Sequence, residues 1–228
     1  MRGGVVVFPG SNCDHDAYHT IKHVLGEHAE YVWHKDHNLT GFDAVIVPGG
    51  FSYGDYLRSG AIARFSPVMQ DVQEFAQSGG PVLGICNGFQ ILVEAGLLPG
   101  ALISNQNLRF ISRMVSIKPE HTNSIFTAGL DTNRGYRMPI AHHDGNYFIT
   151  DRELRELEAN GQIAFRYTTM DGVVDPKANP NGSVANIAGV FNPEKNVLGL
   201  MPHPERAAEL VLGSADGLEL FRSIQGYS

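Results

Sequence analysis

Cys86 is the residue best placed to do chemistry, because it has Gly84 two positions before it and Gly88 two positions after it. Apolar residues 82–85 predict a strand before the cysteine, and the spacing of apolar residues in 89–95 predicts a helix after it. Glycines at these positions allow the sharp strand–turn–helix elbow that directs a nucleophile outward. The N-terminus of the helix would favour a thiolate. The alternative is an unreactive cysteine buried at the end of a strand.

A base for this thiol is offered by residues 202–205, Pro-His-Pro-Glu, the most constrained setting of any of the ten histidines. Pro204 disfavours helical geometry for His203, so we expect an extended segment. Residues two apart in an extended chain share a face, which places Glu205 beside His203. A carboxylate there can orient the imidazole and stabilise its charged form. Alone, the tetrapeptide could be a surface turn; together with the cysteine elbow it indicates a catalytic pair.

Acyl transfer also needs hydrogen-bond donors for the negative charge that develops on the substrate oxygen. One is the backbone N–H of Asn87, directly after the cysteine. Others follow the apolar residues 44–47, where Gly49 and Gly50 precede Phe51. Glycines let backbone amides approach a substrate closely, although a double glycine could also be an ordinary loop. Both segments follow predicted strands, and ligands of open α/β sheets gather at the carboxyl ends of strands.

The composition favours one globular domain spanning residues 1–228, since 43% of the residues are hydrophobic. The formal net charge is −7 and no run of Lys and Arg occurs, so we expect neither nucleic acid nor a membrane as a partner. Cys13 and Cys86 are interpreted as reduced thiols of a cytoplasmic protein. The sequence contains no signal-peptide pattern and no apolar stretch of transmembrane length.

Short apolar segments alternate with helical patterns in the first half of the chain, which is typical of a parallel, doubly wound α/β sheet. The second half has strands separated by turns, which predicts a mixed or antiparallel extension. Strands are expected within residues 5–8, 29–33, 44–47, 82–85, 102–117, 136–149, 163–169, 184–191 and 197–201. Helices are expected from the turn at residues 9–12 to about residue 25, after the cysteine, and at residues 67–77, 151–159 and 214–224.

Several common ligand-binding patterns do not occur in the sequence. It has no glycine-rich phosphate loop ending in Gly-Lys-Ser or Gly-Lys-Thr, and no Gly-x-Gly-x-x-Gly that opens a helix. No spacing of Cys and His supports a zinc site. His142, His143 and Asp144 are consecutive, and neighbouring residues of a strand point to opposite faces, so they do not favour a metal. We therefore expect no metal and no cofactor in this chain.

Two of these motifs, Gly-x-Cys-x-Gly-Phe-Gln at residues 84–90 and Pro-His-Pro-Glu at 202–205, resemble those of the class I (triad) glutamine amidotransferases. Nearly the whole chain is similar to one branch of that family, the glutaminase subunits that serve a synthetase of purine biosynthesis. The further matching segments are residues 9–14, 48–58, 60–64, 201–206 and 213–217. The resemblance implies a three-layer, flavodoxin-like fold with a mostly parallel central sheet and an antiparallel extension.

The resemblance also implies the roles of the triad residues. Cys86 would attack the side-chain amide of glutamine and form a thioester, with release of ammonia and then of glutamate. His203 would take the thiol proton, protonate the departing ammonia and later activate water. Glu205 would complete the triad.

By the same resemblance, the backbone amides of Gly50 or Phe51 and of Asn87 would form the oxyanion hole. Gln90 lies one helical turn after the cysteine and on the same face, so it could contact bound glutamine. The alternative for Gln90 is a polar helix residue that faces solvent.

The chain departs from its relatives at residues 141–145, which read Ala-His-His-Asp-Gly where relatives usually read Ala-His-Gly-Glu-Gly. His143 replaces a glycine, and Asp144 is one methylene shorter than Glu, so we assign no catalytic role to either. Cys13 matches a family position in the first loop, where a structural role is expected.

Ammonia released into water at neutral pH would be protonated and wasted, so a glutaminase needs a consumer. The resemblance implies a large synthetase subunit that uses ATP and magnesium, and a small subunit that bridges the two. Exposed residues of the segment 52–64 are expected to form the docking face. We also expect the glutaminase to be nearly idle until it is docked.

Two other classes of protein remain open from the sequence. Cysteine-elbow peptidases and glyoxalase-like proteins share the Gly-x-Cys-x-Gly turn, although they generally lack a Pro-His-Pro-Glu segment near the C-terminus. A non-enzymatic binding module with a degenerate site is the second alternative, but all three triad residue types are present at Cys86, His203 and Glu205.

Overall fold

The computed structural model describes residues 1–226, and its centre is a nine-stranded sheet with the strand order β2-β1-β3-β4-β11-β10-β9-β6-β7. A separate two-stranded sheet pairs β5 with β8. The strands are β1 (Arg2–Val7), β2 (His28–Trp33), β3 (Ala44–Val47), β4 (Val82–Ile85), β5 (Ala101–Ile103), β6 (Ile111–Pro119), β7 (Tyr136–His142), β8 (Asn146–Phe148), β9 (Ile163–Thr168), β10 (Ile187–Phe191) and β11 (Val197–Leu200).

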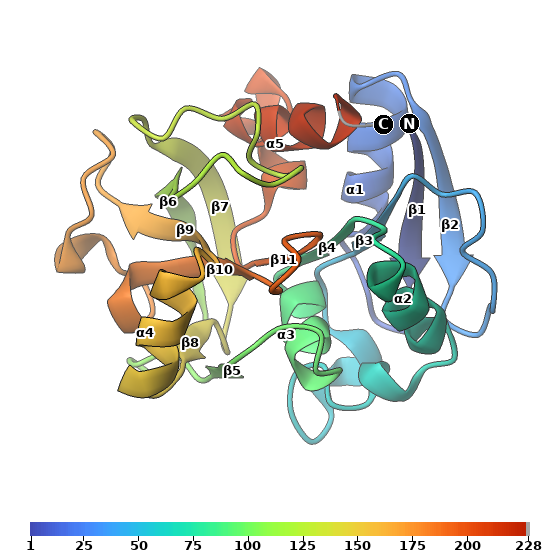
Figure 1. Cartoon of the computed structure of the whole chain (residues 1–228), viewed down its shortest axis with the longest axis horizontal. Coiled ribbons are helices and arrows are strands. Elements are labelled where there is room, and N and C mark those ends of the chain that lie inside the picture. Colours follow the sequence, from blue (N-terminus) through green and yellow to red (C-terminus); the bar gives the residue numbers. More distant parts are fainter. Residues whose placement is uncertain (227–228) are drawn as a thin grey trace.

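Helices cover both faces of the sheet. They are α1 (Asp14–His19), which continues as a π-helix (Thr20–Val24), α2 (Val68–Gln77), α3 (Asn87–Glu94), α4 (Asp151–Ala159) and α5 (Asp216–Gln225). Single 3₁₀ turns lie at Ser52–Asp55, Ala63–Phe65, Pro176–Ala178, Val184–Asn186, Pro204–Ala207 and Leu210–Leu212. Figure 1 shows α1 and α5 on one side of the central strands and α2 and α3 on the other. Over residues 1–226, no helix is both long enough and apolar enough to cross a bilayer.

The first five strands in the sheet order, β2 to β11, run parallel to one another. The central ones are apolar at every position because helices shield both faces: all four residues of β3, β4 and β11 are buried. Parallel strands present their carboxyl ends at the same edge of the sheet. The segments that follow β3, β4 and β11 are therefore brought together at that edge.

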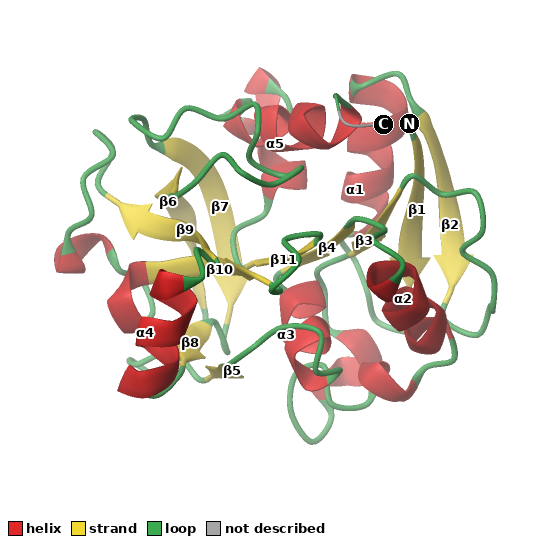
Figure 2. Ribbon diagram, in the orientation of Figure 1, coloured by secondary structure: helices red, strands yellow, loops and turns green. Residues whose placement is uncertain are grey.

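The other four strands, β10, β9, β6 and β7, pair antiparallel and form the predicted extension. Helix α4 lies over this part of the chain in Figure 2. The helix begins with a capping box, in which the Thr150 side chain accepts from the Glu153 amide and the Glu153 carboxylate accepts from the Thr150 amide. The sheet curves enough here for the segment after β11 to reach the edge strand β7: the backbone N–H of His203 donates to Pro139 O at 2.9 Å. Strand β7 therefore lies beside the segment that contains His203.

A few predicted boundaries were wrong. The segment 184–191 is not one strand, since Val184–Asn186 forms a 3₁₀ turn with Ala185 in the left-handed region, and only Ile187–Phe191 pairs as β10. The first strand begins at Arg2 rather than at residue 5. Its early residues are glycines, which a search for apolar runs passes over although their backbone pairs fully.

Buried apolar side chains of both halves of the sheet form one continuous core. Helix α3 packs very closely onto it at Gly88, where a methyl group would overlap Val47 O. No side chain larger than hydrogen fits there without moving β3 or α3. This close approach fixes where the helix begins, and hence where Cys86 lies.

Candidate active site

Cys86 occupies a sharp turn between β4 and α3, as the glycine spacing predicts. Its backbone has φ 49° and ψ −103°, an unusual conformation for a residue with a side chain. Strained backbone of this kind is concentrated at functional sites. The thiol is 5% exposed, and its Sγ donates a long hydrogen bond to Ala141 O of β7 at 3.7 Å. The sulfur is therefore held at the junction of the two halves of the sheet.

His203 and Glu205 form a buried pair. The ring Nδ1 lies 2.6 Å from Glu205 Oε1, and both side chains are almost fully shielded from water. The expectation of an extended segment holds only for His203 (φ −102°, ψ 91°), because Pro204–Ala207 forms a 3₁₀ turn. Pro204 takes the first position of that turn, where its fixed φ suits a helix and its missing N–H costs nothing. The predicted contact is present, but a turn and not a strand produces it.

Neighbouring elements hold this turn from three sides. The His203 amide is bonded to β7, as described above. Thr20, the first residue of the π-helix, donates its hydroxyl to Glu205 O at 3.3 Å. Arg206 Nε donates to Asp16 Oδ2 of α1 at 2.8 Å. Insertions of π-helix are frequent at functional sites, and here the insertion brings a side chain against the backbone of the turn.

Gly49 is the point around which the reactive side chains gather. A methyl group at this position would lie 2.8 Å from His203 Cε1, 3.1 Å from Cys13 Sγ and 3.4 Å from Cys86 Cβ. The absence of a side chain at Gly49 therefore leaves the room in which the imidazole and the two thiols meet. The structure brings the residues predicted as nucleophile and base into one cluster.

His203 titrates well above the ordinary range of a histidine. Burial by itself lowers its pKa, but the carboxylate of Glu205 and the nearby thiols of Cys86 and Cys13 together raise the pKa by more. Neither thiol makes a well-aligned hydrogen bond with the ring, since Nε2 has no hydrogen-bond partner within residues 1–226. Nδ1 is thus held by Glu205, while Nε2 remains free to exchange a proton with Cys86.

Cys13 is a second thiol beside the same histidine. Cys13, His203 and Glu205 each offer an atom within 4.8 Å of the others. Burial raises the pKa of Cys13, which favours the neutral and poorly nucleophilic thiol. We therefore interpret this cluster as acid–base machinery with Cys13 at its border, and Cys86 as the nucleophile. From the resemblance, the first loop with Cys13 could border the pocket, and it does: the Cys13 amide donates to Gly49 O, after β3, at 3.3 Å.

The residues expected to supply oxyanion donors lie at the ends of β3 and β4. Asn87 N follows the cysteine directly and begins α3, and Gly50 adopts φ 140°, a value open chiefly to glycine. The Phe51 amide is already engaged, since it donates to Gly10 O at 3.0 Å. It becomes available to a substrate oxygen only if that bond opens. In this arrangement Gly50 and Asn87 are the better placed pair.

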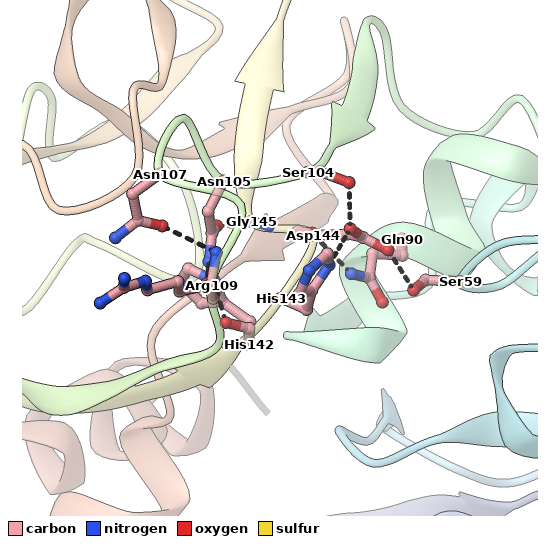
Figure 3. Close-up of polar contacts among 10 residues, drawn as sticks. All are labelled: Ser59, Gln90, Ser104, Asn105, Asn107, Arg109, His142, His143, Asp144 and Gly145. Atoms are coloured by element: carbon pink, nitrogen blue, oxygen red, sulfur yellow. Dashed lines mark hydrogen bonds and ion pairs between the residues drawn. The ribbon is translucent and has the colours of Figure 1, made fainter.

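Gln90 is buried at 5% exposure, so the alternative of a solvent-facing residue is wrong. Figure 3 shows its side chain directed at the turn after β7, where Nε2 donates to Asp144 O at 2.7 Å. Its other amide atom, Oε1, accepts from Asn87 Nδ2 at 2.9 Å. The Asp144 carboxylate accepts in turn from Ser59, Ser104 and His143. Gln90 thus links α3, the helix that follows Cys86, to the turn after β7.

His142 is the last residue of β7, and His143 lies just beyond the strand, so the two are not neighbours on a strand as expected. His143 is half exposed, whereas both ring nitrogens of His142 are buried without a hydrogen-bond partner in the described part of the chain. Burial lowers the pKa of His142 to about 4, and the nearby charge of His203 adds to the shift. His142 is therefore neutral near pH 7.

A buried cysteine on a strand–turn–helix elbow, next to a histidine oriented by a carboxylate, is the arrangement of an enzyme that forms a covalent acyl intermediate. The fold and the site together are those of an enzyme that transfers acyl groups, with Cys86 as the candidate nucleophile. The chain belongs to the CobB/CobQ-like glutamine amidotransferase family, whose domain model matches residues 2–222.

Individual relatives match nearly the whole chain. A phosphoribosylformylglycinamidine synthase subunit PurQ of Moorella thermoacetica is 57% identical over 98% of this chain and 95% of its own length. The subunit of the same name from Aquifex aeolicus is 54% identical over 98% and 99%, respectively. The solved structure of PurLQS from Thermotoga maritima contains a chain that is 42% identical, with a TM-score of 0.88 over 99% of this chain and 98% of that one. A glutamine amidotransferase from the same organism, 17% identical with a TM-score of 0.60, shares the fold.

Proposed function

We propose that this chain is the glutaminase subunit of phosphoribosylformylglycinamidine synthase, the enzyme that makes formylglycinamidine ribonucleotide in purine biosynthesis. The observation that carries the proposal is the cluster at Gly49, where Cys86 on its elbow meets a histidine oriented by a buried carboxylate. Similarity over nearly the full length to subunits with that name supports the proposal further. The two free cysteines suit a reducing cytoplasm, where we place the protein.

The first half of the reaction forms a thioester. Cys86 turns its thiol from Ala141 O towards Nε2 of His203, which accepts the proton. The sulfur attacks the side-chain amide carbon of glutamine, and the oxygen takes up negative charge that the amides of Asn87 and Gly50 stabilise. His203 then gives its proton to the departing nitrogen, and ammonia leaves. The raised pKa of His203 suits this step, because Glu205 and the nearby sulfur stabilise the imidazolium that forms when the ring takes up the thiol proton.

The second half releases glutamate. With ammonia gone, neutral His203 removes a proton from a water molecule, which attacks the thioester carbon. The carbon–sulfur bond breaks, and the sulfur takes the proton back from His203. One water is consumed for each ammonia and each glutamate formed. Glu205 holds Nδ1 throughout, so that Nε2 keeps facing the sulfur.

Gln90 has a positioning role in this proposal, in addition to the glutamine contact predicted for it. Its side chain is already bonded to the Asp144 carbonyl and to Asn87, so it holds the turn after β7 at a fixed distance from the turn that carries Cys86. A glutamine contact would use the second hydrogen of its amide.

The partners we propose are glutamine, a large synthetase subunit and a small bridging subunit of the same enzyme. The synthetase would use ATP and magnesium, and we propose no cofactor or metal for this chain. The segment 52–64 remains our docking face. Its support is the exposure of large apolar side chains there, 69% for Tyr56 and 78% for Leu57, with Phe65 at 73% just beyond.

The proposal is tested by glutamate release from glutamine, measured for the purified chain alone and with the synthetase and small subunits. We expect little release from the free chain, a sharp increase in the complex, and a loss of about 10⁴-fold or more for Cys86→Ala. Activity that is indifferent to Cys86, or no activity even in the complex, would contradict the proposal. Cleavage of casein by the free chain would instead support a peptidase.

The docking face is tested by titrating the wild-type chain and Leu57→Ala with the synthetase and small subunits. We expect Leu57→Ala to raise the concentration needed for half-maximal activation. Val211→Ala removes an apolar side chain that is 87% exposed in the 3₁₀ turn Leu210–Leu212, and it serves as the matched control. An equal effect of the two variants, or a larger effect at Val211, would move the docking face to that turn.

A further inference from the structure

The Asn87 side chain connects α3 to the loop after β3. Its Oδ1 accepts from the Ser52 amide at 3.0 Å, and its Nδ2 donates to Asp55 Oδ1 at 3.2 Å and to Gln90 Oε1 at 2.9 Å. The residue is 1% exposed, and its own backbone amide is a proposed oxyanion donor. The side chain therefore ties that donor to the segment 51–57 on the other side of the helix N-terminus.

The segment 51–57 is itself held in an unusual conformation. Tyr53, Asp55 and Leu57 all have positive φ, at 54°, 52° and 71°, which is uncommon for residues with side chains. The Tyr53 amide donates to Pro9 O at 2.6 Å, and the Phe51 amide to Gly10 O at 3.0 Å. Such backbone persists only where its surroundings fix it, and it is typical of switch and active-site regions.

Asp55 is a residue of this segment whose ionised form is disfavoured by its surroundings. Burial raises the pKa of its carboxyl, and the nearby charge of Asp144 raises it further, while hydrogen bonds from Ser59 and Asn87 oppose the shift. A carboxyl placed between a second carboxyl and the protein interior gains nothing from the location itself. What the carboxylate contributes are the bonds it accepts from Ser59, within its own loop, and from Asn87 Nδ2, on α3.

One short segment thus adjoins both proposed oxyanion donors. It begins at Phe51, directly after Gly50, and it reaches the Asn87 side chain through the Ser52 amide and the Asp55 carboxylate. Its outer surface exposes Phe51, Tyr56 and Leu57. A partner bound over these side chains would fix the segment that adjoins both proposed oxyanion donors.

We propose that Asp55 is a positioning residue that, through the side chain of Asn87, couples the docked face of the segment 51–57 to the oxyanion hole. This inference rests on the proposed function, since the occupant of the face is the synthetase subunit. In the complex the segment is fixed, and the Asn87 amide is held where the substrate oxygen needs it. In the free chain the same bonds are made by a segment that lacks its cover, so the donors are held less firmly and turnover is low.

The test compares Asp55→Ala and Asp55→Asn with the wild type in the complete complex. Asn keeps an oxygen that can accept from Asn87, whereas Ala removes it. We expect Asp55→Ala to lower kcat for glutamate release by about 10- to 100-fold, part of the effect of losing an oxyanion donor, while KM changes less than about threefold. Asp55→Asn is expected to recover most of the rate. Asp171→Ala, at a carboxylate that accepts from the Thr169 hydroxyl in an exposed turn, is the matched control.

A second readout separates positioning from general damage. Alkylation of Cys86 by iodoacetamide needs a reactive thiol but no oxyanion hole, so we expect its rate in the complex to be unchanged by Asp55→Ala. The affinity of the variant for the synthetase should also be unchanged. Wild-type kcat in Asp55→Ala, no rescue by Asp55→Asn, or a parallel loss of alkylation would overturn the inference. If the wild-type complex itself releases no glutamate, the proposed function fails, which is a distinct result.

Discussion

The parallel and antiparallel halves of the sheet contribute to the site in different ways. In the parallel half, β3, β4 and β11 end at one edge, and each is followed within a few residues by a reactive group or a donor: Gly49 and Gly50, Cys86, and His203. The antiparallel half supplies backbone carbonyls, at Pro139 and Ala141, and the neutral side chain of His142. Chemistry is thus concentrated on one half, and the other half encloses and supports it.

This difference follows from strand direction. Parallel strands deliver every carboxyl end to the same edge, so three segments distant in sequence can converge there. Antiparallel strands alternate, so that half can bring only every second connection to the edge. If this view is correct, substitutions at the parallel edge should change turnover, and substitutions in the antiparallel half should change mainly stability.

The largest effect is expected for Glu205→Gln. The carboxylate of Glu205 raises the pKa of His203 against the effect of burial, so its removal should lower that pKa and destabilise the imidazolium that protonates the departing nitrogen. We predict a fall in kcat of about 10³-fold, with the alkaline limb of the pH–rate profile shifted to lower pH. The measurement is glutamate release by the complex between pH 5 and 9. An unchanged alkaline limb would show that Glu205 does not set the charge of His203.

The next effect concerns stability and comes from the antiparallel half. His142 has a pKa of about 4 in the folded protein and about 6.5 when unfolded, so between these values the unfolded chain binds more protons. The free energy of unfolding should therefore fall as pH falls from 6.5 to 4, by on the order of 3 kcal/mol from this residue. Urea unfolding across this range should be less pH-dependent in His142→Gln. Equal pH dependence in the two proteins would show that His142 titrates normally.

A third substitution, Gly49→Ala, acts at the parallel edge without removing any reactive group. Its methyl group would lie 2.8 Å from His203 Cε1 and 3.1 Å from Cys13 Sγ, so the imidazole must move. We predict a loss of about 100-fold in kcat, as expected for a displacement of about 1 Å. The control is Gly129→Ala, where the nearest atom, Ser223 Cβ, lies at 3.8 Å. Similar kcat values for the two variants would contradict the packing described at Gly49.

The smallest effect is expected at α4, in the antiparallel half. Thr150→Ala removes the hydroxyl that accepts from the Glu153 amide and so breaks the capping box. We predict a loss of about 1 kcal/mol in the free energy of unfolding and no change in kcat. Chemical unfolding and glutamate release on the same samples provide both values. A fall in kcat of more than threefold would contradict the expectation that substitutions in the antiparallel half change mainly stability.

The sequence predicted the local parts of the site and missed the parts that depend on distant packing. The elbow at Cys86 and the pairing of His203 with Glu205 are encoded within a few residues, so glycine spacing and a Pro-His-Pro-Glu motif were sufficient. Even there, a 3₁₀ turn at Pro204 replaced the expected extended geometry. A proline in the first position of a helical turn is as favourable as one after an extended residue, and sequence alone does not separate them.

The residues that sequence reasoning placed less well are held by contacts across the sheet. Gln90 looked like either a ligand contact or a surface residue, and its bond to Asp144 O depends on the curl that returns β7 to the site. The same curl buries His142. The bond from the Phe51 amide to Gly10 O joins two loops that no sequence pattern connects. Each of these contacts requires the tertiary fold to be known first.

The central claim, that Cys86 is the nucleophile of a glutaminase, is tested most directly by covalent labelling. The complex would be treated with a glutamine analogue that carries an electrophilic diazoketone, with and without excess glutamine, and the adduct located by peptide mass spectrometry. Cys13 is an internal control, because it is a second thiol beside the same histidine. We predict a single adduct on Cys86 that glutamine suppresses. An adduct on Cys13, an adduct that glutamine does not suppress, or no adduct at all would contradict the account.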